Sequence, residues 1–324
     1  MSVTLWQNVP QEVELSSMVK ERVYKKNQLM VGSTGRKQRK HVFDWINVTL
    51  MILFAALSVY PLIYVLAGSF SEGADYIKGG IYLFPRVFSL ENYEVVLKDV
   101  RLWKAFGITI ARTVLGTVTA VIYTAIVAYA MSRPNLLAKK AIYRFFVFTM
   151  FFGGGLIPYF WVINFLGLFD SFFVYIIPAL FSVYNMLVFV NFFKTIPEEI
   201  HESAVMDGAS EFRILFKITL PLSGPVISTI ALWIAVGHWN SFFDTMIYTS
   251  NENLWSLQYY LMKVVNEASL PPAGIGLPYE LLEKVAPETV SLAAIIVSVI
   301  PIFILYPLIL KTLTKGVVIG SLKG

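Results

Sequence analysis

Residues 202–221, with the sequence ESAVMDGASEFRILFKITLP, form a polar stretch between two long apolar segments. Pro197, just before this stretch, fits the first turn of a helix because that turn does not need the missing N–H. Three residues separate Ala204 from Gly208, and glycine supplies the left-handed backbone that commonly follows a helix C-terminus. Ser210 can then cap a second helix. The stretch therefore predicts two short helices joined by a turn at Gly208.

The composition of the whole chain indicates a membrane protein. Of its 324 residues, 56% are hydrophobic and 15% are charged, whereas soluble domains carry about 25% charged residues. The chain has no cysteine, which excludes disulfides and cysteine-ligated metal sites. Its three histidines are widely separated in the sequence, so no metal site is expected.

Six segments are apolar and long enough to cross a bilayer about 30 Å thick. The glycines at 153–155 and Pro158 are expected to break or bend the third segment. Arg112 lies in the second segment and is expected to reach the outer surface or to face protein. The predicted spans lie near residues 43–67, 106–131, 142–165, 171–193, 225–248 and 289–311.

The distribution of charge predicts the orientation of these spans. Placing residues 1–41, the loops 132–144 and 194–217, and the C-terminus in the cytosol puts 18 of the 26 lysines and arginines on that side. Because cytosolic segments of membrane proteins carry an excess of these residues, both termini are expected in the cytosol. Residues 1–41 then form a basic tail, either solvated or containing an interfacial helix. The same charges account for topology, so no nucleic-acid partner is expected.

Two long segments remain on the outer side, residues 68–105 and 249–288. The first is expected to form a loop with short interfacial structure. The second is expected to contain a helix over residues 254–266, followed by a proline-punctuated loop. This helix either packs against the outer membrane face or docks an extracellular partner.

The spacing within residues 195–224 resembles the EAA loop of ABC importer permeases. The pattern of that loop is E-A-A, three residues, G, nine residues and I-x-L-P. Ser203 stands where the family usually has alanine, which is a small-for-small difference. The residues that match the pattern are Glu202, Ala204, Gly208 and Ile218-Thr-Leu-Pro221.

The resemblance extends over about residues 40–324. Four short motifs look like the corresponding motifs of carbohydrate-uptake permeases. Three of them precede the loop or open it, namely Leu156-Ile-Pro158, Gly167-Leu-Phe-Asp170 and Ile196-Pro-Glu-Glu199. The fourth is Trp239-Asn240 in the fifth predicted span. The tail from Lys315 to Gly324 resembles the subset that handles oligosaccharides and complex sugars, to which the second maltose-type permease belongs. Before this tail, the chain has Thr312-Leu-Thr where the subset usually has an aromatic residue.

This resemblance implies an all-α type I permease fold for residues 42–324, in a multi-pass protein of the bacterial plasma membrane. It implies one permease subunit of a binding-protein-dependent importer, paired with a second permease of a different chain. Two ATP-binding subunits would hold ATP and magnesium, and an extracytoplasmic solute-binding protein would deliver an oligosaccharide. The chain itself lacks the G-x-x-x-x-G-K-[ST] phosphate loop, so it is not expected to bind ATP or to be an enzyme.

In this family, the first helix of the EAA loop docks into an ATPase subunit and passes its movement to the spans. The residues that the resemblance assigns to this coupling are Glu198, Glu202, Ala204, Met206, Asp207, Gly208, Phe212, Leu220 and Pro221.

Amides, hydroxyls and aromatic rings inside the spans suit a sugar path, because they hydrogen-bond hydroxyls and cover C–H faces. Such groups usually face a bundle interior or a water-filled path, but they can equally bond between helices or form interface belts. His238 is expected to be a satisfied interior histidine. Asp244 is expected near the outer interface, where it could bind a cation or substrate. The candidate path residues are Tyr159, Tyr184, Asn185, His238, Trp239, Asn240 and Asp244.

Two other functions remain open. An ion-coupled secondary transporter would need intramembrane carboxylates or ion sites at broken helices, and Asp244 is the main candidate for such a site. A purely structural membrane subunit is the third possibility. Stable association with an ATPase subunit would favour the importer, and ion-coupled transport by this chain alone would favour the secondary transporter.

Overall fold

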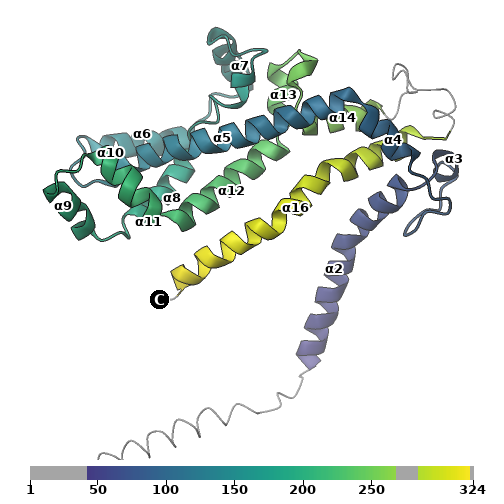
Figure 1. The fold of residues 1–324 in the computed structure, drawn as a ribbon, viewed down its shortest axis with the longest axis horizontal. Helices are drawn as coiled ribbons and strands as arrows, with labels where there is room; N and C mark the ends of the chain where they lie inside the picture. Colours follow the sequence, from purple (N-terminus) through teal and green to yellow (C-terminus); the bar gives the residue numbers. More distant parts are fainter. Residues whose placement is uncertain (1–41, 268–283, 322–324) are drawn as a thin grey trace, which may run out of the picture. The chain divides into compact units, whose positions relative to one another are not determined.

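The structure is a computed structural model that describes residues 42–267 and 284–321 (Figure 1). The expectations for the basic tail 1–41 and for residues 268–283 of the outer segment lie outside these residues. The chain divides into two units, residues 1–60 and residues 61–324, and each is described by itself. Every element named within the described residues is a helix, which agrees with the predicted all-α class.

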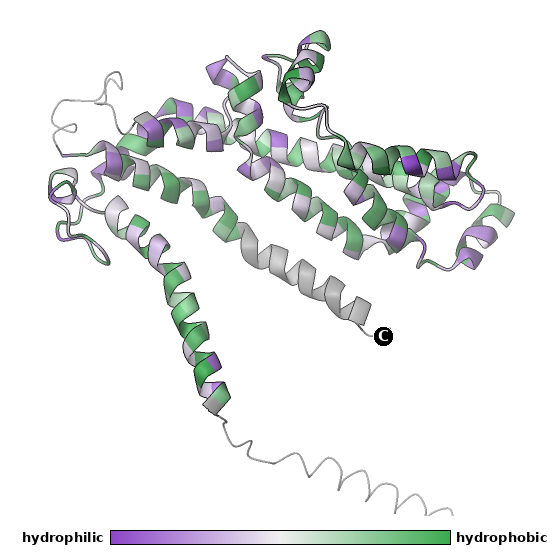
Figure 2. Ribbon diagram, turned by 180° about the vertical axis from the view of Figure 1, so that it is seen from behind, coloured by the Kyte–Doolittle hydropathy of each residue, from purple (hydrophilic) through white to green (hydrophobic). Residues whose placement is uncertain are grey.

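Helix α2 (Val42–Ser69) covers the first predicted span. Its residues from Phe43 to Ser69 are long and apolar enough to cross a membrane, as the hydropathy colouring shows (Figure 2). The boundary between the two units falls within the residues of this helix, with the second unit beginning at Pro61. The large apolar side chains before Pro61 are exposed, which suits a helix that faces lipid.

Helix α5 (Val100–Ser132) has the most extensive helix contacts in the second unit, and they are made with two helices. Helices α8 (Val183–Phe193) and α12 (Gly224–Asn240) lie along it, and α16 (Pro287–Ser321) lies along α12 (Figure 1). Small buried residues of α5, such as Ala125, let the neighbouring backbones approach closely.

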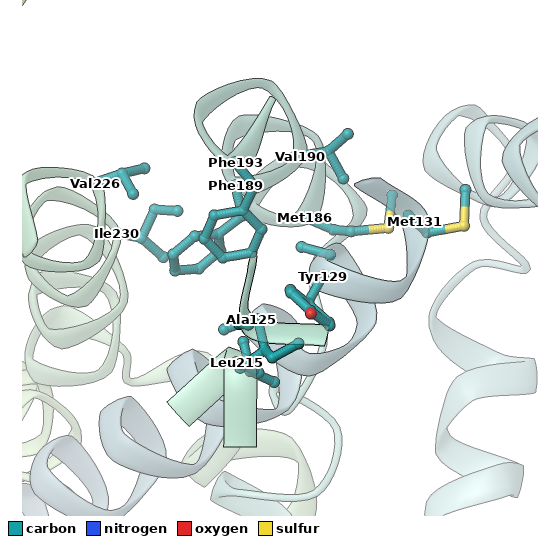
Figure 3. Close-up of a cluster of buried hydrophobic side chains, with 13 residues drawn as sticks. Ala125, Tyr129, Met131, Met186, Phe189, Val190, Phe193, Leu215, Val226 and Ile230 are labelled. Carbon is teal, nitrogen blue, oxygen red and sulfur yellow. The ribbon is translucent and has the colours of Figure 1, made fainter. Parts of the chain in front are cut away.

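The core between α5, α8 and α12 also takes in part of the loop 195–224 (Figure 3). Phe189 of α8 and Ile230 of α12 are fully buried there. Ile214 and Leu215, which belong to the loop, are buried in the same cluster. The loop is therefore packed against the spans and does not stand apart from them.

Three helices of the described residues are long and apolar enough to cross a membrane, namely α2, α5 and the Pro287–Ile304 part of α16. Two pairs of helices that meet at a bend raise the number to five if each pair is one span. The six predicted spans are therefore not six continuous helices. The differences lie at breaks in the third, fourth and fifth predicted spans.

The third predicted span consists of α6 (Lys139–Phe151) and α7 (Leu156–Phe165), which are bent by 115°. The break falls on the glycines that the sequence indicated, and Gly155 has a φ of 84°. A residue with a side chain is disfavoured in that conformation, because its Cβ would clash with the backbone. The glycines thus separate two helices and do not merely bend one.

The prediction of one continuous helix over residues 171–193, the fourth span, is wrong. It begins as the 3-10 helix η1 (Phe172–Tyr175), and α8 starts only at Val183. Pro178 cannot occupy a helix interior without removing a hydrogen bond. The hydroxyl of Ser182 accepts a hydrogen bond from the backbone N–H of Asn185 at 3.4 Å, so Ser182 caps α8.

The fifth predicted span, 225–248, is also interrupted. Helix α12 ends at Asn240, and the short α13 (Phe243–Tyr248) follows. The Ser241 hydroxyl donates to the Asp244 carboxylate at 3.0 Å. One guanidinium nitrogen of Arg112 lies 3.5 Å from the Ser241 carbonyl oxygen, which also accepts from the Ser256 hydroxyl at 3.2 Å.

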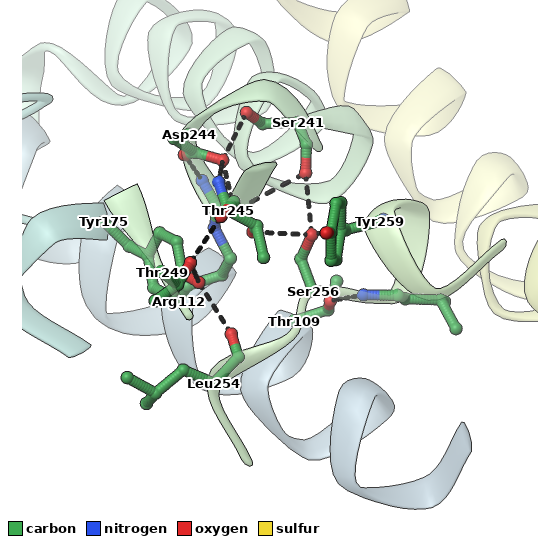
Figure 4. A network of polar contacts seen from close by, with 11 residues as sticks. Thr109, Arg112, Tyr175, Ser241, Asp244, Thr245, Thr249, Leu254, Ser256 and Tyr259 are labelled. Atoms are coloured by element: carbon green, nitrogen blue, oxygen red, sulfur yellow. Dashed lines mark hydrogen bonds and ion pairs between the residues drawn. The ribbon is translucent and has the colours of Figure 1, made fainter. Parts of the chain in front are cut away.

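Arg112 is the centre of this polar network (Figure 4). Its side chain is 1% exposed and forms an ion pair with Asp244, with one N–O distance of 3.1 Å. The guanidinium carbon lies 4.2 Å from the centre of the Tyr175 ring, and the Tyr175 hydroxyl donates to the Leu254 carbonyl at 2.6 Å. Arg112 therefore faces protein, the second of its two expected placements.

The outer segments contain short helices. Residues 68–105, where short structure was expected, contain α3 (Gly73–Tyr76) and α4 (Glu91–Lys98). The helix expected over 254–266 is α14 (Leu257–Glu267), which follows the 3-10 helix η3 (Glu252–Leu254). It begins later than expected, and Ser256 caps its start, because the Ser256 hydroxyl accepts from the backbone N–H of Tyr259 at 3.4 Å. The N–H of Leu257 donates to the Thr109 hydroxyl of α5 at 2.8 Å.

Replacing Arg112 by alanine should strongly destabilise the protein. The substitution leaves the mostly buried Asp244 carboxylate without its counter-charge, and breaking a buried ion pair costs about 3–5 kcal/mol. The measurement is the free energy of unfolding in detergent micelles. Lys98→Ala is the matched control, because its pair with Glu94 is exposed on both sides and is worth about 0.5 kcal/mol. An equal loss in the two variants would contradict the structural role of Arg112.

Candidate functional site

The loop 195–224 folds as its sequence predicted. Helix α9 (Glu198–Met206) begins directly after Pro197 and carries two glutamates in its first turn, where negative charge complements the helix dipole. It ends at Asp207, and Gly208 adopts a φ of 75°. The predicted turn is therefore present at Gly208.

A second helix, α10 (Glu211–Ile214), follows the turn. The Ser210 hydroxyl accepts from the backbone N–H of Arg213 at 3.4 Å, so Ser210 is the predicted cap. The chain then forms a π-helix, η2 (Leu215–Thr219), and the short α11 (Leu220–Leu222). Sequence reasoning did not find the π-helix, a rare form that often occurs at functional sites.

The loop leads into α12 through a sharp bend. The segment Glu211–Leu222 meets Gly224–Asn240 at 85°. Pro225 lies in the first turn of α12, where its missing N–H leaves no hydrogen bond unmade. The chain connection from the loop to α12 therefore runs through a few residues around Ser223, which is fully buried.

One face of the loop is turned inward. Ala204 is the buried residue of α9, and it belongs to the core cluster of α5 and α8. Ala204, which the resemblance assigns to coupling, therefore packs against this chain and does not itself face a partner protein. A small residue is suitable here because α9 packs closely on the chain's own helices.

The other face of the loop exposes apolar side chains. Met206 is 88% exposed and Phe212 is 67% exposed, and Val205 is also exposed. Glu202 and Asp207 are exposed beside them in the sequence. Exposed apolar side chains rimmed by polar residues are typical of a protein–protein contact surface. Of the remaining residues assigned to coupling, Glu198 and Pro221 are exposed and Leu220 is half-buried.

The candidate path residues fall into separate places. Tyr159 of α7 lies near Tyr248, with ring centres 6.2 Å apart. His238 is buried against Gly116 of α5, where a Cβ would lie 2.3 Å from the His238 ring nitrogen. Glycine at 116 is therefore required for this close contact. Trp239 is buried, and its indole N–H has no hydrogen-bond partner among the described residues.

Asp244 is not a free carboxylate. It is paired with Arg112, accepts from Ser241, and also accepts from the backbone N–H of Thr245 at 2.9 Å. The expectation that Asp244 could bind a cation or substrate is therefore corrected, because its oxygens are already engaged. Among the residues that the structure describes, no group of histidines and carboxylates could hold a metal ion.

Tyr184 and Asn240 belong to an exposed surface that sequence reasoning found only in part. In the second half of α12, the exposed residues are Trp233, Val236, Gly237 and Asn240, whose spacing places them on one helix face. Tyr184 of α8 is exposed next to this face, with its ring centre 5.9 Å from that of Trp233.

Two further features belong to this surface. Tyr184 also lines a hollow of about 470 Å³ between α6 and α8, and Asn185 is half-buried beside it in the sequence.

Trp233 was missed by sequence reasoning, although its position seven residues before Asn240 would have placed both on one face. We call Tyr184, Trp233, Gly237 and Asn240 the aromatic–amide face.

Comparisons with known proteins identify the family. Residues 29–319 match the family described as "Binding-protein-dependent transport system inner membrane component". The chain is 34% identical over 292 residues to the polygalacturonan/rhamnogalacturonan transport system permease protein YtcP of Bacillus subtilis, covering 88% of this chain and 100% of that protein. It is 28% identical over 286 residues to the trehalose/maltose transport system permease protein MalG of Thermococcus litoralis, covering 84% and 94%.

A solved structure supports the same assignment. A chain in the crystal structure of a bacterial ABC transporter involved in the import of the acidic polysaccharide alginate superimposes with a TM-score of 0.78 at 33% sequence identity. The match covers 86% of this chain and 99% of that chain. The fold is thus that of an ABC importer permease, in a multi-pass protein of the inner membrane. This chain belongs to the family of binding-protein-dependent transport system inner membrane components.

Proposed function

We propose that this chain is a permease subunit of an ATP-driven importer of oligosaccharides, and that the loop 195–224 couples it to an ATPase subunit. The observation that carries the coupling role is the exposure of Met206 and Phe212 on a loop whose opposite face is packed into the spans. A loop built in this way can bind a partner and move the helices behind it. The matched EAA spacing supports the same role.

The proposed substrate class is based on the names of the related transport proteins. The names of those described above refer to polygalacturonan and rhamnogalacturonan, to trehalose and maltose, and to alginate. These substances are all saccharides, and several are polymers. An oligosaccharide derived from a polysaccharide is therefore the proposed cargo.

The proposed assembly follows from the family. A component of a binding-protein-dependent system works with a solute-binding protein, an ATPase and another permease. We propose a second permease of a different chain and two ATP-binding subunits, which would hold ATP and magnesium. Six spans with both termini in the cytosol would place the loop 195–224 on the ATPase side, in agreement with the charge distribution. The chain itself is a transport component and not an ATPase.

An outer hollow is a proposed contact for the solute-binding protein. It measures about 450 Å³ and is lined in part by Glu72, Glu91 and Glu94. A hydrogen bond from the Ser89 hydroxyl, together with Lys284, holds the pKa of the Glu91 carboxyl below its ordinary value. The hollow therefore keeps negative charge and would suit basic side chains of a partner.

The aromatic–amide face is the proposed sugar contact of this subunit. Trp233 and Tyr184 offer ring surfaces that can cover the C–H faces of a sugar, and Asn240 offers an amide for its hydroxyls. Polar groups within a span are costly in lipid, so Asn240 favours a water-filled path over a lipid contact. The ion-coupled alternative receives no support, because Arg112 neutralises the Asp244 carboxylate that it would require.

The coupling role predicts that Gly208→Val lowers transport about tenfold, because a β-branched residue at a φ of 75° carries backbone strain of about 1–2 kcal/mol and displaces α9. The measurement is ATP-driven uptake by the reconstituted transporter, together with its ATPase rate. Gly79→Val is the matched control, because Gly79 has a φ of 74° and open space around it on the outer segment. Unchanged uptake and ATPase coupling in Gly208→Val would contradict the proposed role.

The sugar contact predicts that Trp233→Ala raises the KM for the transported oligosaccharide about tenfold, because it removes the apolar surface that a sugar ring would cover. Trp161→Ala serves as the control, since Trp161 is also exposed but lies on α7, away from α12 in the structure. A KM that stays the same in Trp233→Ala, with normal assembly, would exclude Trp233 from the path.

A further inference from the structure

Helix α9 is held to the rest of the chain by few apolar contacts. Of its nine residues, Ala204 is the one that is buried. If Ala204 were the only attachment, a push on the exposed side of α9 would turn the helix about this contact without moving the spans. A second attachment is required if α9 is to pass its displacement on.

Five side chains supply such an attachment, in a closed ring of contacts between α9, α10 and the end of α5. Tyr129 belongs to the last turn of α5 and Arg133 follows that helix. Glu198 and His201 belong to α9, and Glu211 is the first residue of α10. We call these residues the five-residue ring.

The first half of the ring runs from α5 through α10 to α9. The Tyr129 hydroxyl donates to the Glu211 carboxylate at 2.5 Å. The same carboxylate lies 3.2 Å from one ring nitrogen of His201. These two contacts join α5 and α9 through the side chain that opens α10.

The second half of the ring returns from α9 to α5. The other ring nitrogen of His201 lies 3.5 Å from the Glu198 carboxylate, and the same carboxylate oxygen is 3.3 Å from a guanidinium nitrogen of Arg133. The guanidinium carbon of Arg133 lies 4.6 Å from the centre of the Tyr129 ring, which closes the circle.

Burial makes the ring more than a set of surface contacts. Tyr129 is buried in the core cluster of α5 and α8, and the His201 and Arg133 side chains are largely shielded. Only the two glutamates face outward, and each of them holds two partners. An isolated surface pair contributes little, but contacts that share partners hold one geometry together.

We propose that the five-residue ring makes α9, α10 and α5 move as one body, so that its members are positioning residues for energy coupling. The inference rests on the proposed function, because it presumes that α9 receives the displacement from an ATPase subunit. With the ring intact, that displacement reaches α5 directly. With the ring open, α9 turns about Ala204 and ATP is hydrolysed without transport.

The test uses the complete transporter in proteoliposomes and measures substrate imported per ATP hydrolysed. Tyr129→Phe keeps the aromatic side chain in the core but removes the hydrogen bond from its hydroxyl to Glu211. It should lower the substrate imported per ATP at least about fivefold, which is the size of a typical coupling between two sites. Tyr143→Phe is the matched control, because the Tyr143 hydroxyl is exposed and forms no hydrogen bond with the described residues.

A charge exchange separates positioning from folding. Arg133→Glu and Glu198→Arg should each lower the ratio, and the double variant should restore most of it, because opposite charges again face each other. The amount of assembled complex, measured by size-exclusion chromatography, should stay constant throughout. A merely structural role would change assembly and leave the ratio of the assembled fraction unchanged.

The outcomes also distinguish this inference from the proposed function. If Gly208→Val lowers transport while Tyr129→Phe and the single charge variants keep the normal ratio, the ring is not a coupling device and the proposed function stands. If the purified chain binds no ATPase subunit, the proposed function and this inference both fall. A lowered ratio in Tyr129→Phe with rescue by the charge exchange supports the ring.

Discussion

A membrane-spanning segment can break only where its freed backbone groups find new partners, and buried Arg112 meets this requirement for the second unit. The fifth predicted span stops at Asn240, and the guanidinium of Arg112 lies against the Ser241 carbonyl and the Asp244 carboxylate at this point. The same side chain packs on the ring of Tyr175, which fixes the 3-10 helix that precedes α8. One buried cation therefore joins the break in the fifth predicted span to the 3-10 helix η1.

Helix α5 connects this network with the loop 195–224. Arg112 and Tyr129 lie on it seventeen positions apart, which corresponds to about 25 Å of helix. The buried residues between them include Gly116, Ala120 and Ala125, so α5 packs closely on its neighbours and behaves as a rod. A helix of this kind has two polar anchor points, one at a broken span and one at the five-residue ring. A displacement of one end is therefore felt at the other.

Local chemistry made part of this structure predictable. Gly208 and Ser210 could be assigned because a left-handed turn and a helix cap depend on single residues. The continuous helices expected over 171–193 and 225–248 were wrong. Pro178 interrupts the first of them. In the second, apolar composition does not reveal that Arg112 and Asp244, 132 positions apart, satisfy the break. The inward placement of Ala204 and the exposed position of Trp233 depend on helix packing, which spacing alone does not determine.

The aromatic–amide face lies between two constraints on the same helix. Helix α12 is joined at its start to the loop through the 85° bend, and at its end it meets the break held by Arg112. Movement of the loop therefore cannot translate α12 freely, because the far end is fixed by a buried ion pair. The motion left to it is a tilt or rotation, and this changes how Trp233 and Asn240 face the neighbouring space. In the proposed function, the same geometry that holds the span broken would thus convert a push on the loop into a changed contact with the sugar.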